Sequence, residues 1–280
     1  MTPICAASFL LLTVSAFEPP QKPDRPKPPQ APTEAAVEVA RISLVTGEVE
    51  VQRGTAVWTR AAEDQPLSIG DRVRTLQGAT ARLEFPWTVV AMSDNSEVSL
   101  QKNRLLTLQL DSGRIDVDPE EALLRIVTAE ATISGTGRTL VRRDGALTFV
   151  ASYNGGATVE SPVSLVRLGV GKGTLVKAAE APSEPVRLPQ PPRVTSPGSD
   201  PRYIRPGEIV HLTWTGTDPV YHLEVLPIDS DVPVVSIDVA ATEYELKLSW
   251  IGTFRWRISG RNGSVESVPS GEGLICVVEK

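Results

Sequence analysis

The sequence predicts an all-β protein made of two β domains that a proline-rich tract separates. Apolar and polar residues alternate along many short segments, and Gly paired with Asp or Asn separates several of these segments. No segment sustains the 3.6-residue apolar period of an amphipathic helix. The chain has 280 residues, which is enough for about two domains with hydrophobic cores.

The charge balance is ordinary for a protein in solution. There are 28 Lys and Arg residues and 34 Asp and Glu residues, which gives a formal net charge of -6. This excess of acidic residues gives no electrostatic reason to bind nucleic acid, so we expect no nucleic-acid partner. Only two His residues occur, which leaves little material for chemistry that depends on imidazole.

Residues 1–16 have the pattern of a signal peptide. Residues 4–14 are apolar or small, and Val14-Ser15-Ala16 fits the small-residue rule for signal peptidase. We therefore expect cleavage after Ala16 and a periplasmic or extracellular protein. A membrane-spanning helix needs roughly 20 apolar residues, so this run predicts no stable membrane span. No Lys or Arg precedes the apolar run, although a signal peptide usually has a positive charge there. The alternative is therefore a disordered N-terminal tail.

The two cysteines are not expected to form an internal disulfide. Cys5 would leave with the signal peptide, and Cys276 would then have no partner in the chain. The segment "GLICVVEK" around Cys276 alternates like a final strand, which predicts a buried thiol.

Two proline-rich tracts predict the domain boundaries. Residues 17–36 combine proline with mixed charges and have almost nothing to bury, which predicts a disordered, polyproline-like spacer. Residues 179–198 have a similar composition and are expected to be a linker. The predicted domains therefore span residues 37–178 and 199–280.

Residues 37–178 are expected to form short strands. In "ARLEF", Ala81, Leu83 and Phe85 would share one buried face. Hairpins are predicted at Asp111-Ser112-Gly113 and at Asp144-Gly145, because strand-like runs flank both. The run "DPEEALLRIV" is predicted to form at most one helical turn.

The segment "LSIGDRVRT" at residues 67–75 predicts a turn inside an otherwise apolar, extended stretch. Leu67, Ile69 and Val73 are expected to lie on one buried face. Gly70 can adopt a positive φ, and the Asp71 carboxylate can accept a hydrogen bond from a nearby amide, so this pair predicts a turn.

Residues 199–280 predict a small immunoglobulin-like sandwich. About seven strand-like runs follow one another in about 80 residues, and the lack of the Cys…Trp…Cys pattern favours the fibronectin type III-like group. Val210, Leu212 and Trp214 are expected to form a core face. In "TFRWRI", the three apolar residues are expected inward, with Arg255 and Arg257 outward.

No motif predicts catalysis, a cofactor or a metal ion. "GVGKGT" at residues 169–174 lacks the Ser or Thr that follows Lys in a phosphate-binding loop, and "ISGTGRT" lacks the order of a nucleophile elbow. His211 and His222 lie on predicted strands without other ligands at metal-binding spacing, which predicts exposed or hydrogen-bonded histidines. We therefore expect no enzyme activity, no cofactor and no metal site.

The first predicted domain resembles FecR domains in the order of its segments. "GEVEVQRG…W", "LSIGDRVRT", "ATARLEF", "SEVSL", "LQLDSGRIDV", "IVTAEATISGTGRTLVRRDGALTFVASYNGG" and "VRLGVGKG" follow one another as they do in that family. The most specific matches to the family are Gly70-Asp71, Gly113 and Gly135-Thr136. The resemblance covers about residues 42–177. It implies that these residues form structural turns and do not contact a ligand.

The resemblance also implies two kinds of function. Members similar to the founding regulator carry iron-dicitrate signals across the inner membrane to a sigma factor, and a cytoplasmic helical segment and a membrane helix precede their FecR domain. In this chain we expect an export signal and a spacer there. The leading hypothesis is an exported, non-enzymatic envelope protein that binds or scaffolds another envelope protein or a cell-wall glycan. The alternative is a soluble sensor subunit of a FecR-type signalling complex linked to iron transport.

Overall fold

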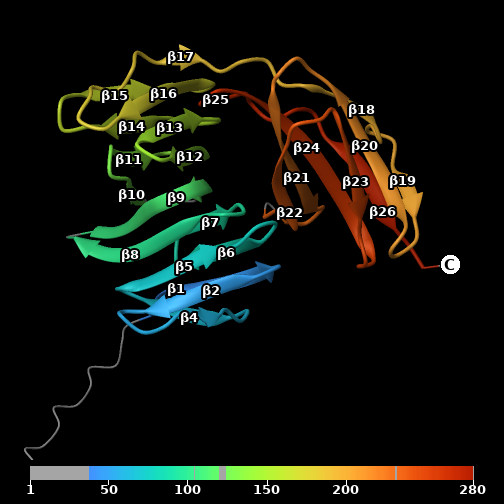
Figure 1. Ribbon diagram of the computed structural model, residues 1–280, viewed down its shortest axis with the longest axis horizontal. Helices are drawn as coiled ribbons and strands as arrows, with labels where there is room; N and C mark the ends of the chain where they lie inside the picture. Colours follow the sequence, from blue (N-terminus) through green and yellow to red (C-terminus); the bar gives the residue numbers. More distant parts are fainter. Residues whose placement is uncertain (1–37, 104, 120–123, 231, 280) are drawn as a thin grey trace, which may run out of the picture. The chain divides into compact units, whose positions relative to one another are not determined.

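The computed structural model describes residues 38–103, 105–119, 124–230 and 232–279. These residues form 26 strands and no helix, which confirms the all-β prediction (Figure 1). They accordingly contain no helix that could cross a bilayer. The predicted signal peptide and spacer lie outside the described residues, and so do residues 120–123 of the predicted helical turn.

The first β block contains strands β1 to β17. Their bounds are β1 (Glu38–Thr46), β2 (Val49–Arg53), β3 (Thr59–Arg60), β4 (Gln65–Ser68), β5 (Asp71–Thr75), β6 (Thr80–Phe85), β7 (Thr88–Met92), β8 (Glu97–Asn103), β9 (Leu105–Pro119), β10 (Arg125–Val127), β11 (Thr132–Gly135), β12 (Thr139–Asp144), β13 (Leu147–Ser152), β14 (Ala157–Glu160), β15 (Leu165–Leu168), β16 (Lys172–Lys177) and β17 (Val186–Arg187).

These strands pair along two paths that share β9. Sheet A has the order β4-β1-β6-β7-β9-β12-β13-β16-β17. Sheet B has the order β3-β2-β5-β8-β9-β10-β11-β14-β15. The pairing of β9 with β10 is parallel, and the other pairings in these two paths are antiparallel.

The predicted hairpin at Asp111-Ser112-Gly113 is wrong, because β9 continues through these residues. Its first half pairs with β8 and its second half pairs with β7 and β12, so this one strand passes from sheet B to sheet A. The register with β8 shifts between Glu97 and Val98, which marks a bulge at the crossing. Turn-forming residues therefore bend a strand here and do not end it. The hairpin predicted at Asp144-Gly145 is confirmed, since β12 pairs with β13 across it.

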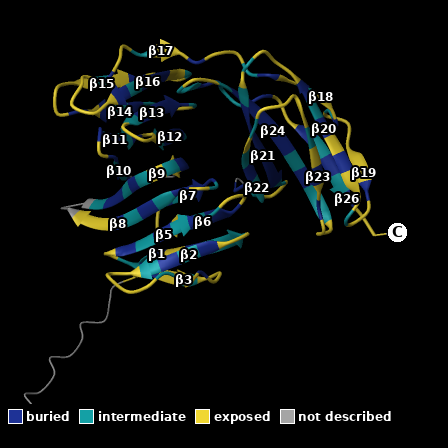
Figure 2. Ribbon diagram, in the orientation of Figure 1, coloured by how far each residue is buried: buried dark blue, intermediate teal, exposed yellow. Residues whose placement is uncertain are grey.

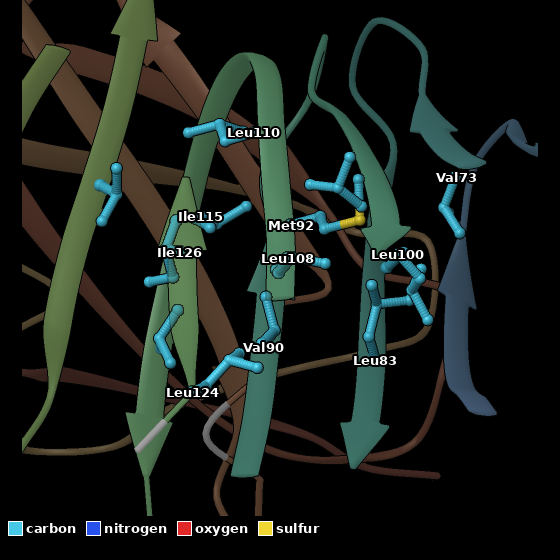
Figure 3. Packing of buried hydrophobic residues seen from close by; sticks show 14 of the residues in the cluster. Val73, Leu83, Val90, Met92, Leu100, Leu108, Leu110, Ile115, Leu124 and Ile126 are labelled. Carbon is cyan, nitrogen blue, oxygen red and sulfur yellow. The ribbon is translucent and has the colours of Figure 1, made fainter. Parts of the chain in front are cut away.

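The hydrophobic core of the first block draws residues from both sheets. Ile115 of β9 and Leu83 of β6 come from sheet A, whereas Leu100 of β8 and Leu108 of β9 come from sheet B, and all four are buried. Figure 3 shows such side chains directed into the space between neighbouring ribbons. The alternation of each strand thus supplies one face to a shared core.

The second β block contains strands β18 to β26. Their bounds are β18 (Arg193–Ser196), β19 (Arg202–Ile204), β20 (Ile209–Thr215), β21 (Val220–Pro227), β22 (Val235–Val239), β23 (Glu243–Lys247), β24 (Gly252–Asn262), β25 (Val265–Glu266) and β26 (Gly273–Val277). They form a three-stranded sheet, β18-β20-β23, and a second sheet, β19-β26-β24-β21-β22, in which β25 also pairs with β24.

The two sheets of the second block enclose their own core, as the sequence predicts for a sandwich. Val210, Leu212 and Trp214 of β20 are buried, which confirms the predicted core face of this strand. Trp214 packs against Trp256 of β24 with ring centroids 6.2 Å apart, and against Tyr221 of β21 at 5.6 Å.

Three predictions about single side chains need correction. Ile69 is 39% exposed, because it lies in the turn beside Gly70 and does not continue the buried face of Leu67. Arg257 was expected to face solvent but is only 6% exposed. Cys276 lies on the final strand as predicted, but its thiol is half-buried and lies 3.6 Å from Thr253 Oγ1.

The tract at residues 179–198 contains hydrogen-bonded structure. Strand β17 pairs with β16 of the first block, and β18 pairs with β20 of the second block. Leu188 is buried, and the Ser183 hydroxyl accepts the amide of Leu175 at 3.0 Å. Each end of this tract is therefore attached to its neighbouring block.

Candidate functional site

The strands that join the two blocks are buried on both faces. Along β21, six consecutive residues are buried, and β12 and β13 show similar runs (Figure 2). One face of each strand enters the core of its own block. The opposite face, which alternation alone would leave to solvent, packs against the other block.

Arg114 of β9 is the central residue of this junction. Its neighbour Ile115 enters the first core, so Arg114 points away from that core and is only 5% exposed. The Nη1 atom donates to Glu224 Oε1 of β21 at 3.1 Å, and Nη2 donates to Glu266 Oε1 of β25 at 3.1 Å. One guanidinium thus binds carboxylates from two strands of the other block, as its planar fork of donors allows.

Two further arginines complete a buried charge network. Arg142 of β12 donates to Glu266 Oε2 at 3.1 Å and to the carbonyl oxygen of Ser264 at 2.8 Å. Arg257 of β24 donates from Nε to Glu224 Oε2 at 2.6 Å. Each buried glutamate therefore accepts from two arginines. We call Arg114, Arg142, Arg257, Glu224 and Glu266 the junction network.

The network compensates for the cost of burying its charges. Burial raises the pKa of Glu224, but the charges of Arg257 and Arg114 outweigh that effect and hold the pKa well below its usual range. Burial lowers the pKa of Arg114, but Glu266 and Glu224 outweigh it and raise the pKa well above its usual range. The geometry therefore keeps both residues charged, and removal of one partner would leave a buried charge unpaired.

His222 of β21 extends the network to the surface. Because a guanidinium has no acceptor, Arg114 Nη1 must donate to His222 Nε2, 2.6 Å away. The proton of the neutral ring then lies on Nδ1, which donates to Asp238 Oδ1 at 2.9 Å. Burial raises the pKa of Asp238, but the hydrogen bond from His222 and the charge of Arg261 outweigh that effect and lower it to about 2.

A polar cleft of about 510 Å³ opens over this part of the junction. Arg114, Arg142 and His222 are among the lining residues, and the carboxylates of Asp94 and Asp238 also line it. Burial raises the pKa of Asp94. The basic groups of the cleft already bind carboxylates of the chain, so the arrangement serves first to hold the two blocks together.

Uncharged contacts support the same junction. The Thr80 hydroxyl of β6 donates to the carbonyl oxygen of Pro233 at 2.9 Å, and the Ser236 hydroxyl donates to the Ser93 hydroxyl oxygen, Oγ, at 2.8 Å. Phe149 of β13 belongs to a small buried cluster against which Val265 packs. The junction is therefore both polar and apolar.

The described residues place no three His, Cys, Asp or Glu side chains so that they could hold a metal ion. His211 is mostly exposed and lies 3.9 Å from Glu245, whereas His222 is buried and hydrogen-bonded. These are the two states that the sequence predicts for strand histidines.

Gly70 lies in the turn between β4 and β5, and Asp71 is the first residue of β5. Gly70 has a φ of 92°, and Asp71 Oδ2 accepts the amide of Ser68 at 2.9 Å. Strand β4 belongs to sheet A and β5 belongs to sheet B, so this turn carries the chain from one sheet to the other.

The remaining predicted turn residues lie where another segment of the chain comes close to their backbone. Gly113 has a φ of 86° within β9, and a Cβ atom there would lie 2.6 Å from the carbonyl oxygen of Asn95. Gly135 ends β11, where a Cβ atom would lie 2.5 Å from Thr139 Oγ1. Thr136 donates its amide to the carbonyl oxygen of Gly156 at 2.8 Å.

Sequence reasoning missed the junction network. Its arginines and glutamates occupy non-core positions of alternating strands, which are usually solvated. The available signal was a complementarity of charge between predicted strands. The segments "TLVRRD" and "FRWRI" carry arginines, and "HLEV" carries a glutamate. Nothing in the sequence shows that these faces meet.

Comparison with known proteins gives only remote likeness. No family model matches the chain, and no curated protein matches it. Two crystal structures of a putative anti-sigma factor from Parabacteroides distasonis ATCC 8503 are each 17% identical to it, with TM-scores of 0.35 and 0.34. The matched region covers 41% of this chain and 58% of that protein.

Two multidomain structures match over more of the chain at lower similarity. The FN1-FN3 domains of chicken CNTN1 are 9% identical, cover 86% of this chain over 99% of their own length, and have a TM-score of 0.25. Domains A168-A170 of titin are 12% identical, cover 87% of this chain over 100% of their own length, and have a TM-score of 0.27. At these scores the likeness carries no argument about function.

Proposed function

We propose that this protein is an exported, non-enzymatic binding or scaffold protein of a bacterial cell envelope, built on a FecR-type domain. The observation that carries this proposal is the junction network, in which Arg114 binds Glu224 and Glu266 of the other block. Buried charge pairs of this kind fix the register between two surfaces, because other arrangements leave charges unpaired. The two blocks then act as one rigid support for their loops.

The FecR-type assignment of the first block is supported by its sequence order and by its turns. The Gly70-Asp71 pair carries the chain between the two sheets, and the Gly113 backbone allows β9 to cross from one sheet to the other. Both roles are structural. The proposed working surfaces are therefore the loops and clefts at the junction.

The export part of this proposal is tested by expression of the full chain in a Gram-negative host. We expect the purified periplasmic form to begin at Phe17 after removal of the predicted signal peptide. A cytoplasmic form that begins at Met1 would contradict export. N-terminal sequencing of each cell fraction distinguishes the two results.

The binding part is tested with the purified mature protein. Saturable cross-linking to an envelope protein, or saturable sedimentation with isolated peptidoglycan, would support a binding or scaffold role. A periplasmic reference protein without envelope affinity is the control. No saturable association with either material would contradict the role, and association with a membrane regulator of a sigma factor would favour the sensor subunit.

A further inference from the structure

A groove of about 440 Å³ lies where the end of β1 meets two loops of the second block. Its volume is within the range of about 300–1,000 Å³ that is usual for ligand pockets. Leu44 and Val45 of β1 contribute from the first block, and Ile228, Trp250 and Ile251 contribute from the second. The junction network therefore supports a surface that neither block forms alone.

The loops beside this groove expose large apolar side chains. Trp250 is 55% exposed, and Ile228 and Ile251 are also more than half exposed. The amide of Ile228 donates to the carbonyl oxygen of Thr253 at 2.9 Å, so the loop after β21 and the start of β24 are joined. Large apolar side chains that lie together at the surface are typical of binding sites.

The charge at the groove is of one sign. Its charged lining residues are Glu63 and Asp229, and no Lys, Arg or His lines it. Glu63 Oε1 accepts the amide of Val45 at 3.4 Å, which holds this carboxylate beside β1. Among the described residues, neither Glu63 nor Asp229 forms an ion pair.

We propose that this groove binds a peptide segment of a partner protein that carries a bulky apolar side chain next to a Lys or Arg. The apolar side chain would pack against Trp250 and Ile251, and the cation would face the two carboxylates. Most lining residues are apolar, which favours a peptide over a glycan, because sugars need a dense array of polar partners. This inference rests on the proposed binding function and identifies the class of partner.

The test uses the full mature chain and fluorescein-labelled heptapeptides. The probe peptide has two lysines that flank a Leu-Pro-Leu core. In one control peptide glutamates replace the lysines, and in a second control serines replace the leucines. An oligomer of N-acetylglucosamine is the glycan probe. Fluorescence anisotropy should show that the probe peptide binds at least roughly tenfold more tightly than either control.

Variants of the chain localise the binding. Trp250→Ala, and Glu63→Gln combined with Asp229→Asn, should each weaken binding of the probe peptide by roughly tenfold or more. Trp87→Ala is the matched control, because Trp87 is also exposed but lies outside the groove, and it should bind normally. Ile251→Lys should weaken binding by repulsion, which gives a second readout if Trp250→Ala folds poorly.

The outcomes separate this inference from the broader proposal. No binding of the probe peptide up to about 1 mM, equal binding of the three peptides, or full binding by both Trp250→Ala and Ile251→Lys would overturn the inference. Glycan binding that Trp250→Ala abolishes would also overturn it, yet would leave an envelope-binding function intact. Failure of export would instead remove the proposed function, whatever the peptides do.

Discussion

Arg114 Nη1 lies 2.6 Å from His222 Nε2, and this contact joins the first β block to the second. The two residues lie on strands whose opposite faces belong to different cores. The contact works only while Nε2 of His222 lacks a proton, because both atoms would otherwise be donors. The tautomer of one ring is thus tied to the junction between the blocks.

This relationship predicts the tautomer of His222. We expect the neutral ring to carry its proton on Nδ1, because Nε2 accepts from Arg114 and Nδ1 donates to Asp238. Long-range ¹H–¹⁵N NMR spectra at about pH 8 distinguish the two ring nitrogens. His211 is exposed and serves as the internal control. A proton on Nε2 of His222 would contradict the geometry.

Removal of Arg114 should destabilise the protein strongly. Arg114→Met leaves Glu224 and Glu266 each short of one buried partner, so we expect the free energy of unfolding to fall by about 3–5 kcal/mol. Urea unfolding followed by tryptophan fluorescence measures this change. Arg41→Met is the control, because Arg41 and Glu38 form an exposed pair worth about 1 kcal/mol or less. Equal effects of the two variants would show that the junction network contributes little.

Asp238 should make stability sensitive to acid. Its pKa in the folded protein is about 2, below the ordinary value of 3.8. The ionised carboxylate therefore stabilises the fold above the ordinary pKa, and this contribution is lost as the pH falls from about 4 towards about 2. Asp238→Asn should reduce the loss of stability over that interval, measured as urea midpoints at successive pH values.

Asp144→Asn provides the comparison for this experiment. Asp144 also binds an arginine of the junction network, but its side chain is mostly exposed. We expect this variant to keep the acid-induced loss of the unchanged protein. If Asp238→Asn also kept the full loss, the hydrogen bond of Asp238 with His222 and its ion pair with Arg261 would not govern the acid response.

Gly70 should contribute to stability through its backbone conformation. Its φ is 92° and a Cβ atom there would contact nothing, so Gly70→Val adds conformational strain alone, and should cost about 1–3 kcal/mol. Gly169→Val is the matched control, because Gly169 also has open space around it but has no positive φ. Thermal unfolding monitored by circular dichroism should show a lower Tm for Gly70→Val only.

Asp71 directly follows this turn as the first residue of β5, and its substitution should have a smaller effect on stability. Asp71→Ala loses the hydrogen bond from the Ser68 amide, so we expect a cost of about 1 kcal/mol. Binding of any partner, measured on the folded fraction, should be unchanged. Full stability together with loss of binding would instead identify Asp71 as a ligand contact.

The tract between the predicted domains should be cut by limited proteolysis at residues 179–201, and each fragment should stay folded because each block has its own core. The junction network should hold the two fragments together after the cut. We therefore expect them to elute together from a size-exclusion column, and to separate when the Arg114→Met chain is cut in the same way. Resistance of the whole tract would contradict the predicted boundary.

Alternation along the chain was enough to predict the strands and most core faces. Ala81, Leu83 and Phe85 are buried as expected, and Leu212 and Trp214 form part of the second core. These predictions succeed because a strand exposes its two faces to different surroundings, and a residue-by-residue pattern records which face is apolar. The turn residues Asp144 and Gly145 likewise specify a local backbone conformation.

The same local information fails where a strand changes partners. Asp111-Ser112-Gly113 has the composition of a hairpin, but β9 continues through it, because β7 and β12 are available to pair with its second half. Turn propensity describes the backbone that these residues allow. Whether the chain reverses there depends on strands that are distant in the sequence.

The sequence by itself predicted that Arg257 lies on the outward face of its strand, and alternation gives every strand such a face opposite the core. It could not determine what covers those faces. Only the tertiary structure brings the outer face of β9 and β12 against β21, β24 and β25, and so converts side chains expected in solvent into a buried network. The physical reason is that alternation specifies a direction from the strand, whereas burial depends on whether another surface lies in that direction.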